Sequence, residues 1–90
     1  MSPAFHGADP KELRAFANEL DRAQDTLMAV RHELSARINN NLRWEGPDAF
    51  VFKHAWQSSY APVIARTAAE LRHTAQLVRA QAAAQESASS

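Results

Sequence analysis

Four histidines are the side chains best suited to bind a metal or transfer a proton near neutral pH in this 90-residue chain. They are His6, His32, His54 and His73. No two of them are three or four positions apart, the spacing that places two ligands on one face of a helix. The chain has no cysteine, so a thiolate metal site and a disulfide are both excluded. We therefore interpret the histidines as surface residues and expect no metal site.

Catalysis requires groups that converge, and the sequence lacks the patterns that supply them. The chain has only two glycines and no glycine-rich loop of the phosphate-binding kind. It offers no nucleophile with a base at hand and no pair of carboxylates in a plausible cleft. We expect that the protein is not an enzyme and needs no cofactor.

Charge and hydropathy argue against two further classes of partner. Ten basic and ten acidic residues cancel, whereas a nucleic-acid-binding protein usually carries a basic excess. No segment approaches the roughly 20 apolar residues that span a bilayer, so stable membrane insertion is not expected. The first residues, MSPAFHGADPKEL, lack the charged and apolar regions of a secretory signal peptide. The protein is expected to be cytoplasmic, or to leave the cytoplasm by a route that recognises another signal.

The first half of the chain predicts a helix over about residues 10–40, preceded by an N-terminal tail at residues 1–9. Asp9 is expected to cap this helix, with Pro10 at its first position and Glu12 completing a capping box. Apolar residues then alternate at intervals of three and four, the pattern of a coiled-coil-like packing face. These residues are Leu13, Phe16, Leu20, Ala23, Leu27, Val30 and Leu34, with Ile38 and Leu42 continuing the stripe.

A turn is predicted at residues 41–46. The three asparagines at 39–41 are poor helix formers and are expected to end the first helix. Gly46 precedes Pro47 and is expected to cap the second helix, at a position where alanine costs about 1 kcal/mol. Trp44 could close the end of a helical bundle, burying up to ~250 Å² of surface.

The second half predicts a helix over about residues 47–84, which completes a hairpin domain at 10–84, followed by a flexible tail at 85–90. Its apolar residues recur near the helical period: Ala49, Phe52, Trp56, Tyr60, Ile64, Leu71, Ala75, Val78 and Ala82. Pro62 lies inside this helix, where it removes one hydrogen bond and clashes with the preceding turn. The favoured prediction is a kink at Pro62 within a continuous helix; the alternative is a break that divides the helix in two.

Two long antiparallel helices would leave apolar surface uncovered. Phe50, Val51 and Phe52 are consecutive, so they spread over about 200° of helix surface, more than one neighbouring helix can cover. We therefore predict an all-α helix-turn-helix hairpin that pairs into a dimeric four-helix bundle. The residues expected in its core or dimer interface are Leu13, Phe16, Leu20, Leu27, Leu34, Phe50, Phe52, Trp56, Tyr60, Ile64 and Leu71.

The sequence resembles the WXG100 (ESAT-6-like) family at its central turn. Trp44-Glu45-Gly46 provides the W-x-G motif, and Ala49, Phe52 and Trp56 match the small and aromatic residues that follow it in the family. The stretch WEGPDAF is similar to actinobacterial members. The resemblance covers the whole chain, including its length, its central motif and its two helical arms.

This resemblance implies a partner and a route of export. It implies an antiparallel dimer with itself or with a second WXG100 chain. It also implies export by a type VII (ESX) secretion system without a cleaved signal peptide, as an effector or a co-secreted partner. The secretion ATPase would then be a further partner, and Trp44 and Gly46 would lie on a surface that the machinery recognises. Trp44 as a mere plug of the bundle end stays an alternative.

One departure from the family pattern concerns the export signal. Family members often carry Tyr-x-x-x-Asp/Glu after the second helix, but the only tyrosine here is Tyr60, and Ile64 stands four residues after it. Either a partner chain supplies the signal, which favours a heterodimer, or the tail is recognised differently. A non-secreted dimeric helical adaptor remains the alternative function.

Overall fold

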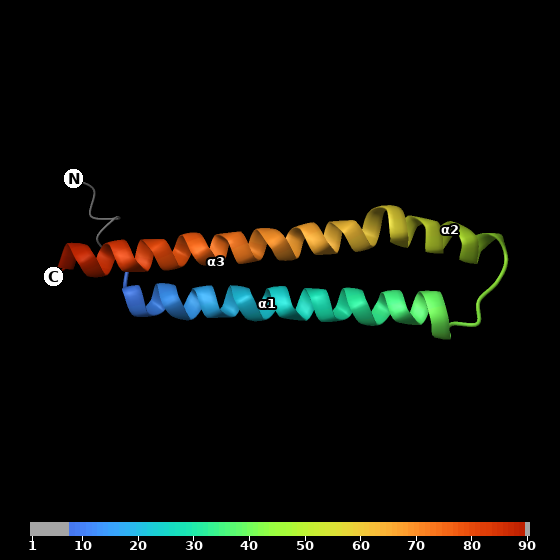
Figure 1. The fold of residues 1–90 in the computed structure, drawn as a ribbon, viewed down its shortest axis with the longest axis horizontal. Coiled ribbons are helices and arrows are strands. Elements are labelled where there is room, and N and C mark those ends of the chain that lie inside the picture. Colours follow the sequence, from blue (N-terminus) through green and yellow to red (C-terminus); the bar gives the residue numbers. More distant parts are fainter. Residues whose placement is uncertain (1–7, 90) are drawn as a thin grey trace.

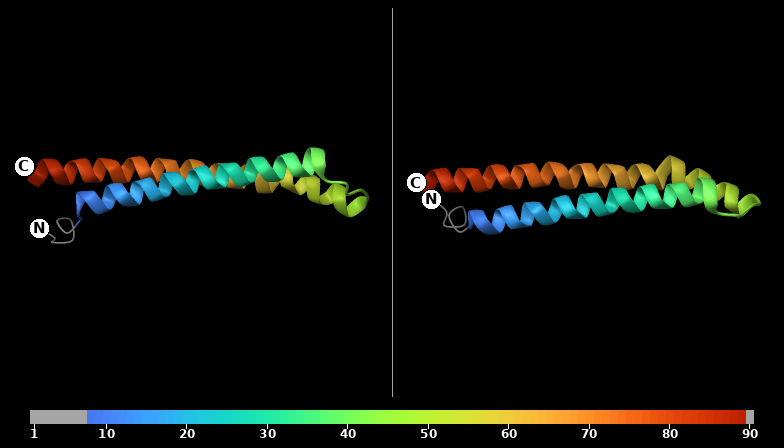
Figure 2. Two further views of the ribbon diagram at one scale, coloured as in Figure 1. Left: turned by 90° about the horizontal axis from the view of Figure 1, so that it is seen from below. Right: turned by 60° about the horizontal axis from the view of Figure 1, so that its bottom comes forward.

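The computed structural model of the protein describes residues 8–89. Within this range the chain is helical and contains no strand. Two long antiparallel arms lie side by side and cross at a small angle (Figures 1 and 2), and the molecule measures 64 × 22 × 13 Å. The predicted all-α helical hairpin is confirmed.

The first arm consists of α1, Pro10–Ala36, and the wide π-helical turn η2, Arg37–Asn41. Asp9 caps α1 in an extended conformation, and its side chain accepts a hydrogen bond of 2.9 Å from the Lys11 N–H. This bond satisfies one of the free N–H groups at the helix start. The arm ends at Asn41, one position beyond the expected end at 40.

The two arms are joined by four non-helical residues, 42–45, and by Gly46, which caps α2, Pro47–Ala55. Gly46 has φ 105° and ψ 178°, a conformation that is essentially restricted to glycine. The expected cost of about 1 kcal/mol for alanine at position 46 considered the helix cap alone and leaves out the strain of this backbone conformation. A Cβ there would have open space around it, so the whole penalty is backbone strain.

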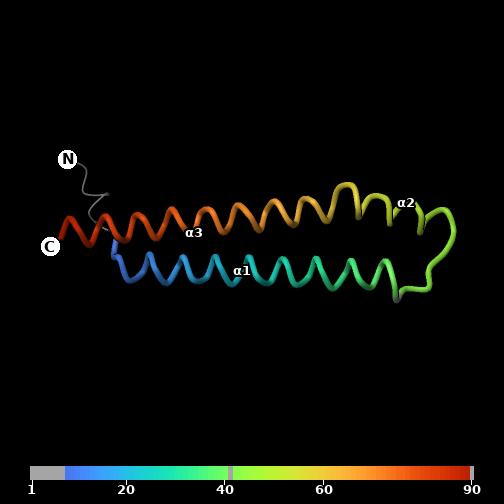
Figure 3. The backbone as a smooth tube through the Cα atoms, in the orientation of Figure 1, coloured from blue at the N-terminus to red at the C-terminus, as the bar shows by residue number. Residues whose placement is uncertain are grey.

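The second arm continues from α2 through the π-helical turn η3, Trp56–Tyr60, into α3, Ala61–Ser89. The Ala61 N–H bonds to the Trp56 carbonyl, five residues back, and Ser58 Oγ donates to the His54 carbonyl at 2.7 Å. Pro62 has no N–H to donate to the Ser58 carbonyl, so the wide turn forms where a regular helical bond is impossible. The chain stays helical through Pro62, without the considered break. The path of the second arm changes direction between α2 and α3 (Figures 1 and 3).

The end of α3 differs from the expected flexible tail at 85–90. The helix extends to Ser89, five residues past the predicted end at 84. Arg14 in α1 forms an ion pair with Glu86, and Ser89 Oγ donates to the Gln85 carbonyl at 2.9 Å. The hydrogen bond and charge of Glu86 raise the pKa of Arg14. The added helical residues are thus tied to the first arm by the Arg14–Glu86 pair.

The seam between the arms is lined mainly by alanine. The buried side chains are Ala17, Ile38, Ala49, Trp56, Ala61, Ala68, Ala75 and Ala82. The four alanines of α3 recur every seven residues, so they lie along one line of the helix surface. Because each contributes only a methyl group, the arms can pack closely.

Candidate interaction surface

The two flanks of the seam differ in chemistry, and ion pairs identify the polar one. Arg79 in α3 contacts Asp21 in α1 at 2.5 Å and Asn18 at 2.9 Å. Arg14 and Glu86 form a second pair about two helical turns away, seven residues from Asp21 and Arg79 along each arm. On α1, Arg14 and Asp21 lie three residues before and four residues after the buried Ala17, which places both on the same flank.

The opposite flank is apolar. Leu13 and Leu20 lie four residues before and three after Ala17, so they face the other side of the seam from Arg14 and Asp21. The same reasoning on α3 places Leu71 and Val78 on the flank opposite to Arg79, because Ala75 is buried between them. We call this flank the apolar side. Its members are Leu13, Phe16, Leu20, Leu27, Val30 and Leu34 of α1 with Ile64, Leu71 and Val78 of α3.

The leucines that recur every seven residues therefore lie beside the seam and not at its centre. Leu13, Leu20 and Leu27 are half-buried, while Leu34 is 42% exposed. The centre of the seam on α1 instead contains Ala17 and Ile38, with Gln24 and Arg31 half-buried between them. Arg31 donates from Nε to the Ala61 carbonyl at 3.1 Å. A long polar side chain is thus accommodated where the alanines of α3 leave room.

Trp56 is the largest side chain in the interior of the hairpin, with only 6% of its surface exposed. It packs with Ile38 and Ala61, and Ile64 lies against this cluster. Its indole Nε1–H donates to Ser35 Oγ at 2.9 Å. This bond satisfies the polar atom of the indole, so Trp56 connects the second arm to the first near the turn.

Trp44 has a different environment. It is 38% exposed, and its ring lies 5.7 Å from that of Phe52, at an angle of 44°. Phe52 in turn lies 6.3 Å from Tyr60. We call Trp44, Phe52 and Tyr60 the aromatic row. Within one hairpin these rings cover one another only in part and remain on the surface.

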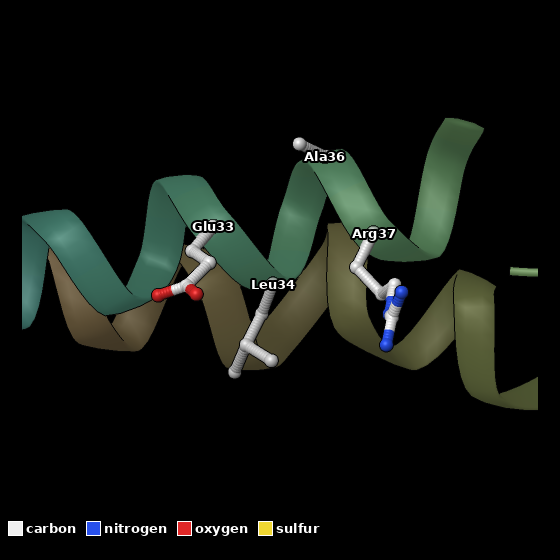
Figure 4. A pocket seen from close by; sticks show the side chains of 4 residues that line it. All are labelled: Glu33, Leu34, Ala36 and Arg37. Atoms are coloured by element: carbon white, nitrogen blue, oxygen red, sulfur yellow. The ribbon is translucent and has the colours of Figure 1, made fainter. Parts of the chain in front are cut away.

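Two hollows lie near the turn. One, of about 280 Å³, is lined by Trp44, Glu45, Gly46, Ala49, Phe50 and Lys53. The other, of about 510 Å³, lies on α1 and is lined by Glu33, Leu34, Ala36 and Arg37. Figure 4 shows the side chains of Glu33, Leu34 and Arg37 projecting the same way, with Ala36 pointing elsewhere. An apolar side chain of a partner could pack against Leu34 in this hollow. The negative charge of Glu33 and the positive charge of Arg37 would lie beside it.

The remaining predicted site residues are distributed over the surface. Phe16, Phe50 and Tyr60 are exposed, and Phe50, at 73%, is the most exposed large apolar side chain among residues 8–89. The alanine seam was not predicted as a unit, although the seven-residue spacing of Ala61, Ala68, Ala75 and Ala82 was readable in the sequence. The interior bonds of Ser35 and Arg31 were also missed, because polar residues on a helix are ordinarily assigned to water.

The histidines that the structure describes lie on the surface. His32, His54 and His73 are exposed, and no group of three or more His, Cys, Asp or Glu residues between 8 and 89 is placed to hold a metal ion. His6 lies outside the described residues. None of the helices in that range is long and apolar enough to cross a membrane.

Comparison with family models, with curated proteins and with solved structures finds no match for this chain.

Proposed function

We propose that this protein is a small dimerising helical hairpin that a type VII secretion system exports, as an effector or as the co-secreted partner of another chain. The observation that carries the proposal is the turn. A W-x-G motif joins two long helical arms, Trp44 is exposed there, and Gly46 has a backbone conformation that glycine alone adopts readily. An exposed tryptophan on a defined turn is suited to recognition by another protein.

Pairing with a second hairpin is supported by the uncovered apolar surface. Phe52 and Tyr60 are 36% and 51% exposed on the second arm, and Phe16, Val30 and Leu34 add apolar surface along α1. Contiguous apolar surface of this kind is typical of an interaction site. A second two-helix hairpin has the length and shape to cover it as a four-helix bundle.

The proposal is tested by a secretion assay in the native host. Trp44→Ala should reduce secretion strongly, while the protein stays folded and abundant in the cytoplasm, because truncation at the exposed turn leaves the seam intact. Leu77→Ala is the matched control, since Leu77 is an exposed apolar residue on α3, far from the turn. Circular dichroism and sizing of both purified variants complete the assay. Normal export of Trp44→Ala would contradict a recognition role for this residue.

The second candidate is a dimeric helical adaptor that is not secreted. It is favoured by one observation: the only tyrosine, Tyr60, is followed four residues later by Ile64 and not by an acidic residue. The two candidates are separated by coexpression with a type VII secretion system and with any W-x-G chain encoded beside this one. Retention of the wild-type protein in the cytoplasm under these conditions would favour the adaptor.

A further inference from the structure

The wide turn η3 changes which residues of α2 face the first arm. The buried alanines of α3 recur every seven residues, and the next position in that series is His54, with Gln57 and Ser58 between it and Ala61. All three are exposed. The buried residues are instead Trp56 and Ala49, which are again seven apart but belong to a shifted series.

The shift follows from one hydrogen bond. The Ala61 N–H bonds to the carbonyl of Trp56, five residues back, where an α-helix bonds four residues back. The turn therefore holds one residue more than a regular turn, and everything before it is rotated by about 100° relative to α3. Pro62 favours this arrangement because it cannot form the regular bond to the Ser58 carbonyl.

The rotation aligns the aromatic row. Phe52 and Tyr60 are eight residues apart, and in a regular helix residues at this spacing point about 80° away from each other. With the extra residue in η3 they share a direction, and their ring centroids lie 6.3 Å apart. Tyr60 is also four residues before Ile64, so it shares a face with the apolar side of α3. The row thus continues the apolar side over the turn.

We propose that η3 and Pro62 form a device that fixes how far α2 is rotated about the helix axis relative to α3. We call this rotation the phase. By adding one residue to a single helical turn, the device points Trp56 inward and joins the row Trp44–Phe52–Tyr60 to the apolar side. The result is one surface along the whole hairpin, with Phe50 outside it. The occupant of this surface is a second helical hairpin, an assignment that rests on the proposed function.

The phase is tested by a pair of variants that differ only in residue count. One combines deletion of Ser59 with Pro62→Ala, which allows a regular helix through this region; the other is Pro62→Ala alone. Tyr60 is the only tyrosine, so its ring signals are identified directly by nuclear magnetic resonance. A nuclear Overhauser contact between the rings of Tyr60 and Phe52 is expected in the wild type. The contact should be lost in Pro62→Ala, where a regular helix points the two rings, eight residues apart, about 80° away from each other. It should return in the deletion variant, where the two residues are seven positions apart in a regular helix and again share a direction. Persistence of the contact in Pro62→Ala, its loss in the deletion variant, or its absence from the wild type would overturn the proposal.

The surface is tested in the full-length chain without changing residue count. Phe52→Ala and Phe50→Ala are the same truncation two positions apart, on opposite faces of α2. Sedimentation equilibrium should show that Phe52→Ala weakens pairing by about tenfold or more, and that Phe50→Ala changes it much less. Equal effects of the two variants would overturn the assignment of the surface. A wild-type chain that stays monomeric but keeps the Phe52–Tyr60 contact would support the phase and count against self-pairing in the proposed function.

Discussion

At the scale of single residues, Gly46 and the two tryptophans are the most constrained positions. Gly46 adopts a backbone conformation that other residues avoid, although the space around it is open. The tryptophans belong to one motif in the sequence, yet one is 6% exposed and the other 38%. These differences lead to two predictions about stability.

Gly46→Ala should lower the free energy of unfolding by about 1–3 kcal/mol, because the added Cβ strains a backbone with φ 105°. Urea unfolding followed by circular dichroism measures this change. Glu45→Ala, at the adjacent exposed position, is the control and should stay within about 0.5 kcal/mol of the wild type. An alanine variant at position 46 as stable as the wild type would show that the turn can adopt another conformation at no cost.

Trp56→Ala should destabilise the hairpin by about 3–5 kcal/mol, because it empties the cluster around Ile38 and breaks the bond to Ser35. Trp44→Ala should cost clearly less, since water already reaches Trp44 and can fill the gap. Thermal and urea unfolding of both variants, at one protein concentration, provide the comparison. Equal losses of stability would mean that Trp44 is buried in solution, as a plug of the bundle end would be.

At the scale of the elements, the alanine seam sets how closely the arms approach. Ala68 and Ala75 are almost fully buried between α1 and α3. Their methyl groups leave no room for a longer side chain unless the helices separate. The ion pairs on the polar flank contribute little beside this packing, since the partners are exposed to water and salt screens them.

Ala68→Leu should therefore destabilise the hairpin by about 1–3 kcal/mol, because the larger side chain forces the arms apart. Ala80→Leu is the control, since Ala80 is exposed on the same helix and leucine is a good helix former there. Urea midpoints of the two variants test the prediction. A stabilising effect of leucine at 68 would indicate that the seam contains unfilled space.

At the scale of the whole molecule, one side of the hairpin carries its ion pairs and the other its apolar residues. A lone hairpin of this kind exposes its apolar side along most of its 64 Å length. Leu34, Phe52 and Tyr60, all partly exposed, lie toward its turn end. Association with a second hairpin would remove this surface from water, which is the main favourable term in assembly.

If the partner is a second copy, sedimentation equilibrium at micromolar concentration should report about 20 kDa, because one chain has a mass of 10.0 kDa. Dilution should then separate the copies and lower the melting temperature. A chain that remains a well-folded monomer throughout would contradict self-pairing. A disordered chain that folds only with a second W-x-G protein would identify a heterodimer.

The start of each arm was determined by local sequence. Asp9 with Pro10 and Gly46 with Pro47 act through the backbone of adjacent residues, so the helix starts and the hairpin were predictable without tertiary information. The apolar repeat of the first arm likewise predicted which of its faces is apolar.

Tertiary structure alone decided the centre of the seam and the direction of α2. A repeat of leucines and a repeat of alanines both have the helical period, and only the packing of two arms places Ala17 and Ala68 inside and Leu34 at the edge. The single extra residue in η3 rotates everything before it, so periodicity counted through Pro62 assigns the wrong face to α2. Trp56 is buried and Phe50 exposed because Trp56 can reach Ser35 and Ile38 on the other arm, contacts between residues distant in sequence.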